Sequence, residues 1–241
     1  MKIDQILGLT EDHLSPLEVN GSWLQIHTEA KSSFEALKKE ALKEFTIDLY
    51  PVSIFRSFEK QKSIWNAKAG GHRTLLNARG EEIDAGLLSE EEKLWAILRW
   101  SALPGASRHH WGSDLDVIDT IALHHYQESF PYYRVELTPS EFEEKPFSGL
   151  HNWLTKKIGE EKSHGFFRPY SQDLGGVSPE PWHLSYWPVA GQTLSYFTLE
   201  KFRDALESSI YKDLELIDVV KYHADKIYRS YVTNVSPPPF S

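Results

Sequence analysis

Hydrophobic and polar residues alternate along the first quarter of the chain in two different periods. Apolar side chains recur at near-helical spacing between Lys and Glu residues at Phe34, Leu37, Ala41 and Phe45. This spacing predicts an amphipathic helix over residues 28–47, with Thr28 or Ser32 as its cap. Residues 47–55 then alternate as in a strand, where Pro51 favours a sheet edge or a bulge. A second helix follows the strand and runs to about Ala69, and Gly70-Gly71 ends it.

The rest of the chain repeats this alternation of helices and short strands. Residues 72–88 are a predicted polar loop, and Ser89 begins a capped helix that runs to Leu103. Strands are predicted at 114–118, 166–170 and 183–187, and helices at 149–161 and over 198–232. Apolar residues show no clean period over residues 120–146, so we interpret this segment as an inserted loop or lid. A packed surface excursion without a lid function is the alternative, and it is favoured. The proline run of the tail 236–241 excludes a helix there.

Composition narrows the classes of function without choosing one. The 241 residues, 40% hydrophobic and 25% charged, are those of an ordinary soluble globular protein of one domain with extensions, or at most two small domains. A net charge of −9 opposes binding to nucleic acid. The chain has no cysteine, so it has no disulfide and any metal site must be built from His and carboxylate side chains.

The sequence does not decide between the cytoplasm and the cell envelope as the location of the protein. The first residues contain no apolar run of signal-peptide length, and no later window approaches the roughly 20 apolar residues of a membrane span. We therefore expect a soluble protein without a recognisable secretion signal, cytoplasmic by that absence, with the cell envelope as the alternative. The oligomeric state is not predicted.

Two short stretches carry the candidate chemistry. The first is Ser107-Arg108-His109-His110-Trp111-Gly112-Ser113-Asp114-Leu115-Asp116, and the second is Glu180-Pro181-Trp182-His183. Together they offer His109, Asp116 and His183 as three zinc ligands. A catalytic zinc site needs three protein ligands, an open position and a base that activates water. Glu180, three residues before the last ligand, would be that base.

The alternative to a metal site is a structural role for each residue, because a His followed by a distant Asp is common. The ordered pattern of both stretches outweighs this alternative. Asp114 is either a partner that fixes the tautomer of a metal-bound His or a solvated loop carboxylate. Histidines outside the pattern are interpreted as surface or hydrogen-bonded structural residues: His110, His124, His125, His151 and His164.

These stretches resemble the signatures of the VanY-type D-alanyl-D-alanine carboxypeptidases, in the zinc peptidase superfamily that includes the Hedgehog-like fold. A third stretch is also similar, because Arg56-Ser57 follows a predicted strand and is followed by Gln61. The resemblance covers about residues 26–187, and the core of the implied peptidase domain is about 26–190. One position departs from the family, which usually has a small apolar residue where this chain has Asp114.

The resemblance implies an α+β fold, with a small central antiparallel sheet that carries the zinc site and helices packed around it. It implies one Zn²⁺ held by His109, Asp116 and His183, with Glu180 as the catalytic base. Arg56 would stabilise the oxyanion or anchor a substrate carboxylate, with a strand-end salt bridge as the structural alternative. Gln61 and Ser107 would line the substrate site, and Trp182 would pack beneath the metal.

The function that this implies is zinc-dependent removal of a terminal D-alanine from peptidoglycan stem peptides or their fragments. A peptidoglycan endopeptidase of the same fold and a non-catalytic zinc-containing binding module are the alternatives. We expect a peptidase domain over residues 1–197 and a C-terminal helical extension with a proline-rich tail over 198–241. Predicted partners are peptide substrates, without nucleic acid and without a membrane span.

Overall fold

The strands and helices come from a computed structural model, which describes residues 1–239. Its strands are β1 (Leu14–Val19), β2 (Ser22–His27), β3 (Leu49–Ser53), β4 (Leu75–Leu76), β5 (Glu82–Ile83), β6 (Asp114–Asp119), β7 (Phe166–Phe167) and β8 (His183–Tyr186). The α-helices are α1 (Ile3–Ile6), α2 (Thr28–Phe45), α3 (Phe58–Ala69), α4 (Glu90–Trp100), α5 (Thr120–Ser129), α6 (Pro139–Glu143), α7 (Ser148–Gly159), α8 (Trp187–Tyr196), α9 (Leu199–Leu206), α10 (Ile217–Tyr222) and α11 (Ala224–Ile227). Short helical turns are η1 (Ala85–Leu87), η2 (Arg108–Trp111), η3 (Ser209–Tyr211) and η4 (Tyr228–Val232).

The central sheet has four antiparallel strands in the order β3-β6-β8-β7. Two antiparallel hairpins, β1-β2 and β4-β5, form separate two-stranded sheets. Strand β3 is an edge strand, and its register with β6 shifts between Pro51 and Ser53. The predicted α+β fold with a small antiparallel sheet is therefore confirmed, and Pro51 lies at both an edge and a bulge, where its missing N–H is tolerated.

Three helices follow the predicted pattern closely. Helix α2 buries the apolar face formed by Ala30, Phe34, Leu37 and Ala41. Its cap, however, is His27, whose imidazole accepts a hydrogen bond from the N–H of Glu29, so the prediction of Thr28 or Ser32 as cap was wrong. Helix α3 ends at Gly70, and the capping box of Ser89 begins α4, which ends at Trp100, short of the predicted Leu103.

Helices were missed in three places, the first of which is the short α1. Residues 120–146, interpreted as a loop or lid, contain α5 and α6, and none of the residues of α5 is buried. A helix without a buried face has no apolar period, which explains the error. The strand predicted at 183–187 ends at Tyr186, and Pro188 lies in the first turn of α8, where proline is favoured. Hairpin β4-β5 was also missed within the predicted loop 72–88.

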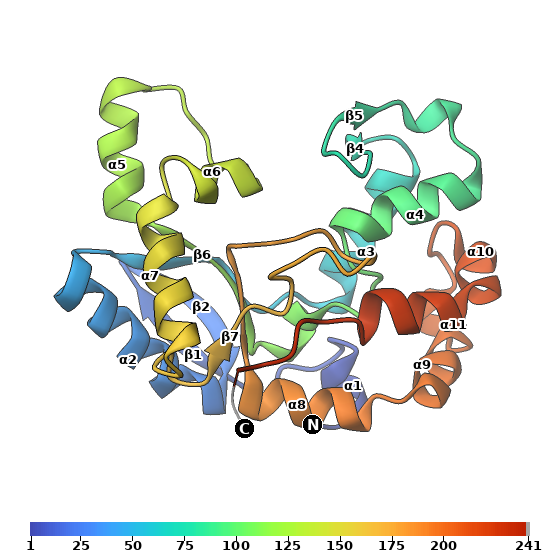
Figure 1. Cartoon of the computed structure of the whole chain (residues 1–241). Coiled ribbons are helices and arrows are strands. Elements are labelled where there is room, and N and C mark those ends of the chain that lie inside the picture. Colours follow the sequence, from blue (N-terminus) through green and yellow to red (C-terminus); the bar gives the residue numbers. More distant parts are fainter. Residues whose placement is uncertain (240–241) are drawn as a thin grey trace.

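Two hydrophobic cores lie side by side. One packs the sheet against α2 and α7, and the other packs α1, α3 and α4 against α8 and the C-terminal helices. The two functional stretches bridge the cores, since Trp111 belongs to the helical core and Trp182 to the sheet core. Two arms rise from the same side of the molecule: α5 with α6, and the β4-β5 hairpin with its connections to α3 and α4 (Figure 1).

The C-terminal helices are tied to the rest of the chain by specific contacts. The indole of Trp65 in α3 donates to the carbonyl of Glu215 (2.9 Å), and the hydroxyl of Tyr211 donates to that of Pro104 (2.9 Å). The division into a domain over 1–197 and an extension over 198–241 stays a prediction. Residues 234–239 contain no helix, as predicted for the tail, and its last residues, Phe240 and Ser241, lie outside the described part.

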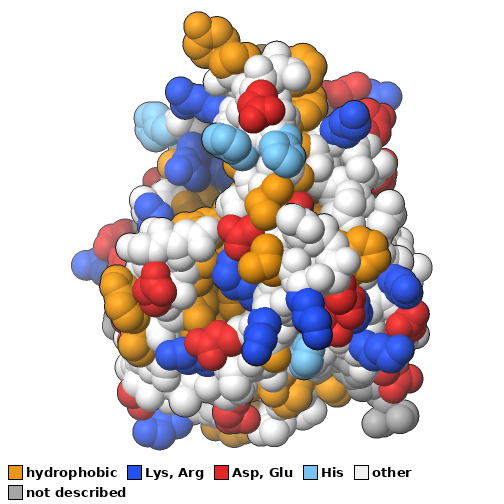
Figure 2. Space-filling model, turned by 90° about the vertical axis from the view of Figure 1, so that its left-hand side faces the viewer, with side chains coloured by type: hydrophobic (Ala, Val, Ile, Leu, Met, Phe, Trp, Pro, Cys, Tyr) orange, Lys and Arg blue, Asp and Glu red, His pale blue; other side chains and the backbone are white. Residues whose placement is uncertain are grey.

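The surface carries charges of both signs. On the side formed by α2, α5 and α7, Lys and Arg side chains are interspersed with Asp and Glu (Figure 2). This face offers no single-sign basic patch of the kind that binds nucleic acid. Among the helices of residues 1–239, none combines the length and the apolar character that crossing a membrane requires.

Candidate metal centre and active-site cleft

The glycine of the first stretch lets the chain turn from η2 into β6. Gly112 has a φ of +67°, a left-handed conformation that favours glycine. A Cβ at this position would lie 2.4 Å from Cδ2 of Leu14 and 3.0 Å from the backbone N of His27. Any other residue would therefore push η2 away from the β1-β2 hairpin, and with it the His109 side chain.

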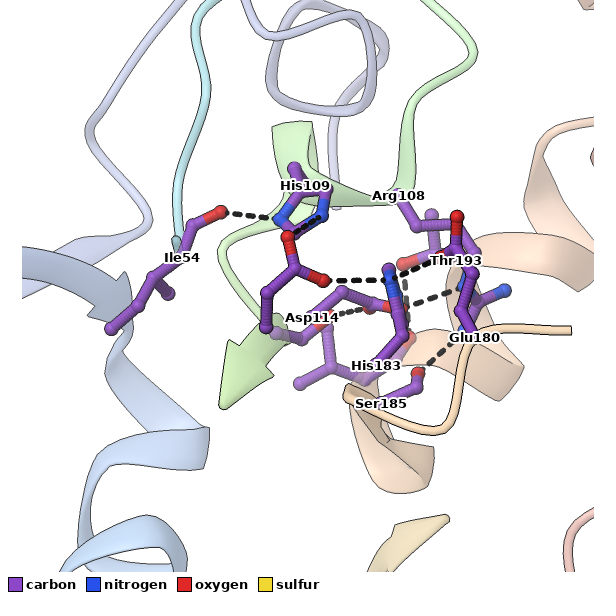
Figure 3. A network of polar contacts seen from close by, with 11 residues as sticks. Ile54, Arg108, His109, Asp114, Glu180, His183, Ser185 and Thr193 are labelled. Atoms are coloured by element: carbon purple, nitrogen blue, oxygen red, sulfur yellow. Dashed lines mark hydrogen bonds and ion pairs between the residues drawn. The ribbon is translucent and has the colours of Figure 1, made fainter. Parts of the chain in front are cut away.

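Strand pairing brings the two stretches together. Asp116 of β6 is directly opposite His183 of β8 in the register of the sheet. One carboxylate oxygen of Asp116 lies 3.2 Å from Nε2 of His109, and the other lies 3.2 Å from Nδ1 of His183. One ligand atom from each of the three buried side chains lies within 4.8 Å of the other two. Figure 3 shows the imidazoles of His109 and His183 close together, with Glu180 near His183.

Hydrogen bonds orient both imidazoles toward this point. Nδ1 of His109 donates to the carbonyl of Ile54 (2.8 Å), which leaves Nε2 free to bind a metal. Nε2 of His183 donates to Oδ1 of Asp114 (3.0 Å), which leaves Nδ1 free in the same way. Such partners fix the tautomer of a metal-binding imidazole and raise its basicity. Asp114 is thus a buried partner of His183 and not a solvated loop carboxylate.

The geometry of the cluster fits a zinc ion. With bonds of about 2.0–2.1 Å, two ligand atoms on a tetrahedral zinc lie about 3.3 Å apart. One ligand atom from each of the three side chains lies within 4.8 Å of the other two, a span that a single ion can bridge after small side-chain shifts. Within residues 1–239, Oδ1 of Asp116 and Nδ1 of His183 are buried without a hydrogen-bond partner. Buried polar atoms without a partner are rare unless a ligand satisfies them, so these two atoms indicate a bound cation.

The electrostatics of the cluster also favour a cation. Burial opposes ionisation of Asp116, but the neighbouring imidazoles, His109 first, hold the pKa of this carboxyl well below its usual value. Burial likewise opposes protonation of His183, yet the carboxylates of Asp114, Asp116 and Glu180 raise its pKa well above the usual value. Ionised carboxylates that attract a proton to this point attract a metal ion for the same reason.

A buried ion pair holds Asp114 in place. Nε of Arg108 donates to Oδ1 of Asp114 (2.7 Å), and Nη2 donates to the hydroxyl of Ser185 (2.5 Å). Burial opposes ionisation of Asp114, but the charge of Arg108 and the contact with His183 lower its pKa. The extra carboxylate in this motif therefore has its own counter-ion, which comes from the second residue of the same stretch.

Glu180 lies beside the cluster without belonging to it. One of its carboxylate oxygens lies 3.2 Å from Nδ1 of His183, and its side chain is 15% exposed, more than the ligand side chains are. The backbone N–H of Glu180 donates to the carbonyl of Tyr170 (2.9 Å), which fixes the turn before β8. A carboxylate that is adjacent to a metal centre and reachable from the cleft has the position of a general base.

Arg56 is positioned by neutral partners. Its guanidinium donates to Oε1 of Gln61 (2.9 Å) and to the hydroxyl of Ser53 (3.2 Å). Its backbone N–H donates to the carbonyl of His109 (3.1 Å), and its carbonyl accepts from Nδ1 of His110 (2.5 Å). Burial lowers the pKa of Arg56, although the charges of Asp116 and Glu180 oppose this effect. Most of its N–H donors remain free for a substrate.

All the site residues predicted from the sequence, except Gln61, face one cleft. A cavity of about 820 Å³ is lined by the three ligands and by Arg56, Ser107, Glu180 and Tyr170. Gln61 is fully buried and lies outside this lining, so its place is behind Arg56. Both arms contribute walls, residues 76–80 from one and residues 136–140 from the other. The excursion 120–146 thus borders the cleft.

Four of the other histidines occupy the places expected of surface or hydrogen-bonded residues, whereas Nδ1 of His151 is buried without a hydrogen-bond partner among residues 1–239. His110 is fully buried and accepts a hydrogen bond from the N–H of Gly105 (2.9 Å). His124 and His125 are exposed on α5, and His164 contacts Glu40 on α2 (2.8 Å). Trp182 packs in the sheet core against Phe142. The sequence did not indicate Tyr170, whose ring contacts His183 edge-on, or the ion pair formed by Arg108.

The fold and the site together define a metallopeptidase. An α+β core holds a His/Asp/His cluster on two antiparallel strands, a glutamate lies beside it, and a guanidinium faces the same cleft. This donor set is one that zinc peptidases use, so the predicted cofactor, Zn²⁺, is confirmed at the level of the site's chemistry.

The chain belongs to the VanY family of D-alanyl-D-alanine carboxypeptidases, whose model matches residues 24–189. This match confirms the predicted family and a hydrolase of the peptidoglycan carboxypeptidase class. Two similar proteins from Haemophilus influenzae are uncharacterised. One is 38% identical over 101 residues, which make up 42% of this chain and 68% of that protein. The other is 29% identical over 133 residues, which make up 54% of this chain and 92% of that protein.

Solved structures with a similar arrangement are more distant. A mutant of the vancomycin resistance D,D-pentapeptidase VanY in complex with Zn(II) is 24% identical, with a TM-score of 0.46, over 77% of this chain and 84% of that one. VanYB in complex with D-alanine-D-alanine is 23% identical, with a TM-score of 0.46, over 81% and 89%. The LD-carboxypeptidase LdcB is 18% identical, with a TM-score of 0.49, over 91% and 78%.

Proposed function

We propose that this cleft hydrolyses the peptide bond before a C-terminal D-alanine of peptidoglycan stem peptides or their fragments. The observation that carries the proposal is the position of Glu180 and Arg56 in the same cavity as the ligand cluster. Family membership supports the class of reaction. His109, Asp116 and His183 would hold one zinc ion, which polarises the scissile carbonyl and makes water more acidic when bound.

The residues of the chain supply the proton transfers. The Glu180 carboxylate accepts a proton from water as the water oxygen forms a bond to the carbonyl carbon. The same carboxyl then returns that proton to the amine nitrogen as the C–N bond breaks, so D-alanine leaves with a neutral or protonated amine. The fixed guanidinium of Arg56 holds either the terminal carboxylate or the oxygen that gains charge. Glu180 and Arg56 end these reaction steps in the protonation states in which they began.

A terminal carboxylate anchor distinguishes a carboxypeptidase from an endopeptidase of the same fold. A peptide that ends in D-alanyl-D-alanine and its C-terminal amide have the same scissile bond, but only the first offers a carboxylate to Arg56. We expect hydrolysis of the acid and at least about tenfold slower hydrolysis of the amide, the loss of one charge-assisted contact. Equal rates on both would support the endopeptidase. Mass spectrometry of the products shows which bond is cut.

The role of Glu180 is tested by Glu180→Gln. This change keeps the shape of the side chain and removes the base, so the rate should fall about 10²–10⁴-fold while the zinc content, measured by elemental analysis, stays at one ion per chain. Glu35→Gln, an exposed change on α2, is the matched control and should keep full activity. Full activity of Glu180→Gln, or activity that survives complete removal of metal by a chelator, would contradict the mechanism. A protein that binds zinc and hydrolyses none of the peptides would support the binding module.

A further inference from the structure

The cleft contains more positive charge than a single terminal carboxylate requires. Lys68, in the last turn of α3, and Arg73, in the loop that follows, line the same cavity as Arg56. The acidic residues in the lining are Asp116 and Glu180 at the ligand cluster and Glu136 on the opposite arm. One wall of the cleft is therefore cationic, in a chain whose net charge is −9.

These cations lack acidic partners. The ammonium of Lys68 donates to the hydroxyl of Ser101 (2.9 Å), and among residues 1–239 the ion pairs include none at Arg56, Lys68 or Arg73. Some half-buried cations of the chain are paired with carboxylates, namely Lys38 with Asp48, Arg99 with Asp173, and Lys157 with Glu40 and Glu44. Others, such as Lys31, Lys62 and Arg168, donate only to carbonyl or hydroxyl groups. Arg79, which also lines the cavity, is paired with Glu81 (3.2 Å). What distinguishes the half-buried Lys68 and the exposed Arg73 is their place, because both line the same cavity as Arg56.

Their charges also act on one another. Burial, then the charge of Arg73, then that of Arg56, lower the pKa of Lys68 to about 8. Arg73 lowers the pKa of Arg56 as well. Glu180 offsets part of this repulsion at Lys68, and Asp116 and Glu180 offset part of it at Arg56. A carboxylate placed between the three cations would offset more of it.

We infer that Lys68 and Arg73 form a second carboxylate subsite, so that the preferred substrates carry a side-chain carboxylate close to their C-terminal D-alanine. The inference rests on the proposed function and on the first of the two roles given there for Arg56, that of holding the terminal carboxylate. That assignment leaves two cations of the same wall without a group to bind. A stem peptide with an acidic residue near the scissile bond provides that group. A structural role, in which Lys68 only links α3 to Ser101, predicts no such preference.

Paired peptides test the inference. Each pair ends in D-alanyl-D-alanine and has Glu or its isostere Gln at one, two or three residues before the scissile bond. At neutral pH, where Lys68 is charged, we expect kcat/KM to favour Glu by about tenfold at one of these positions. Lys68→Met and Arg73→Gln should each reduce that preference, measured as the ratio of kcat/KM for the Glu and Gln peptides, to about twofold or less.

The control is Lys60→Met, which removes the same charge from an exposed position on α3 that does not line the cavity, and which should keep the tenfold preference. Failure to cleave any peptide would contradict the proposed function itself. Cleavage of Glu and Gln peptides at equal rates at all three positions would overturn the second subsite and leave the proposed function intact. A preference for Glu that survives both Lys68→Met and Arg73→Gln would also overturn it.

Discussion

The ion pair between Arg108 and Asp114 makes a prediction that separates stability from metal binding. Asp114 is fully buried and serves two partners, the guanidinium of Arg108 (2.7 Å) and Nε2 of His183 (3.0 Å). Asp114→Ala removes one carboxylate and affects both partners. It leaves Arg108 as an uncompensated buried charge, and it leaves His183 without the acceptor that orients its ring.

The loss of stability and the loss of zinc affinity differ in size, and a second substitution should restore only the stability. An unpaired buried charge destabilises a protein by about 3–5 kcal/mol, and loss of the hydrogen-bond partner of a metal-binding His costs about 10–100-fold in metal affinity. Arg108→Met combined with Asp114→Ala removes both charges, and replacing a buried ion pair with apolar side chains is often neutral or stabilising. The double variant should therefore recover most of the stability but none of the zinc affinity.

Two measurements on the same proteins test this reasoning. Urea unfolding of zinc-free protein gives the free energy of unfolding, and competition with a chromogenic chelator gives the dissociation constant for zinc. We expect a destabilised, weakly binding Asp114→Ala variant and a stable, weakly binding double variant. If the double variant binds zinc as tightly as the original protein, Asp114 does not orient His183. If Asp114→Ala is as stable as the original protein, the ion pair has no structural value.

Two further predictions concern residues away from the ligands. Gln61→Met removes the acceptor that holds the guanidinium of Arg56. We therefore expect about tenfold lower kcat/KM on peptides with a free C-terminal carboxylate and a smaller preference for these peptides over their C-terminal amides. An unchanged preference would show that Gln61 does not position Arg56. The hydrogen bond from Arg99 and, to a smaller extent, that from the N–H of Gly175 lower the pKa of Asp173 to about 2. The ionised carboxylate therefore stabilises the folded protein above about pH 4, and this stabilisation is lost as the pH falls toward 2. The difference in melting temperature between Asp173→Asn and the original protein should shrink over that range, whereas a constant difference would refute the linkage.

Much of the fold near the site could be predicted from local pattern. The apolar face of α2, the alternation of β3 and the capping box of Ser89 are local signals, and each produced the predicted element. Helix α5 could not be found in this way, because it buries none of its residues. Helix α8 was missed for a different reason, since the proline that seemed to end a strand in fact begins a helix.

The candidate site shows the same division between local and distant information. The spacing of the two stretches identified the ligands and Glu180 as candidates, and the register of β6 with β8 brings Asp116 opposite His183. The cationic wall could not be predicted, because Lys68 and Arg73 belong to no motif and meet Arg56 only in the folded chain. The position of Gln61 behind Arg56 likewise depends on tertiary packing.

Asp114 shows how a buried carboxylate beside the ligand cluster is balanced by a neighbouring charge. An added carboxylate beside a metal centre would by itself raise the cost of burial, but Arg108 on the preceding turn offsets that charge at 2.7 Å. The pair needs Ser185 on the partner strand as well, because Nη2 of Arg108 donates to its hydroxyl. Since Asp114 is paired with Ser185 in the register of β6 and β8, a change at any one of the three positions should alter how the strand that carries His183 is held.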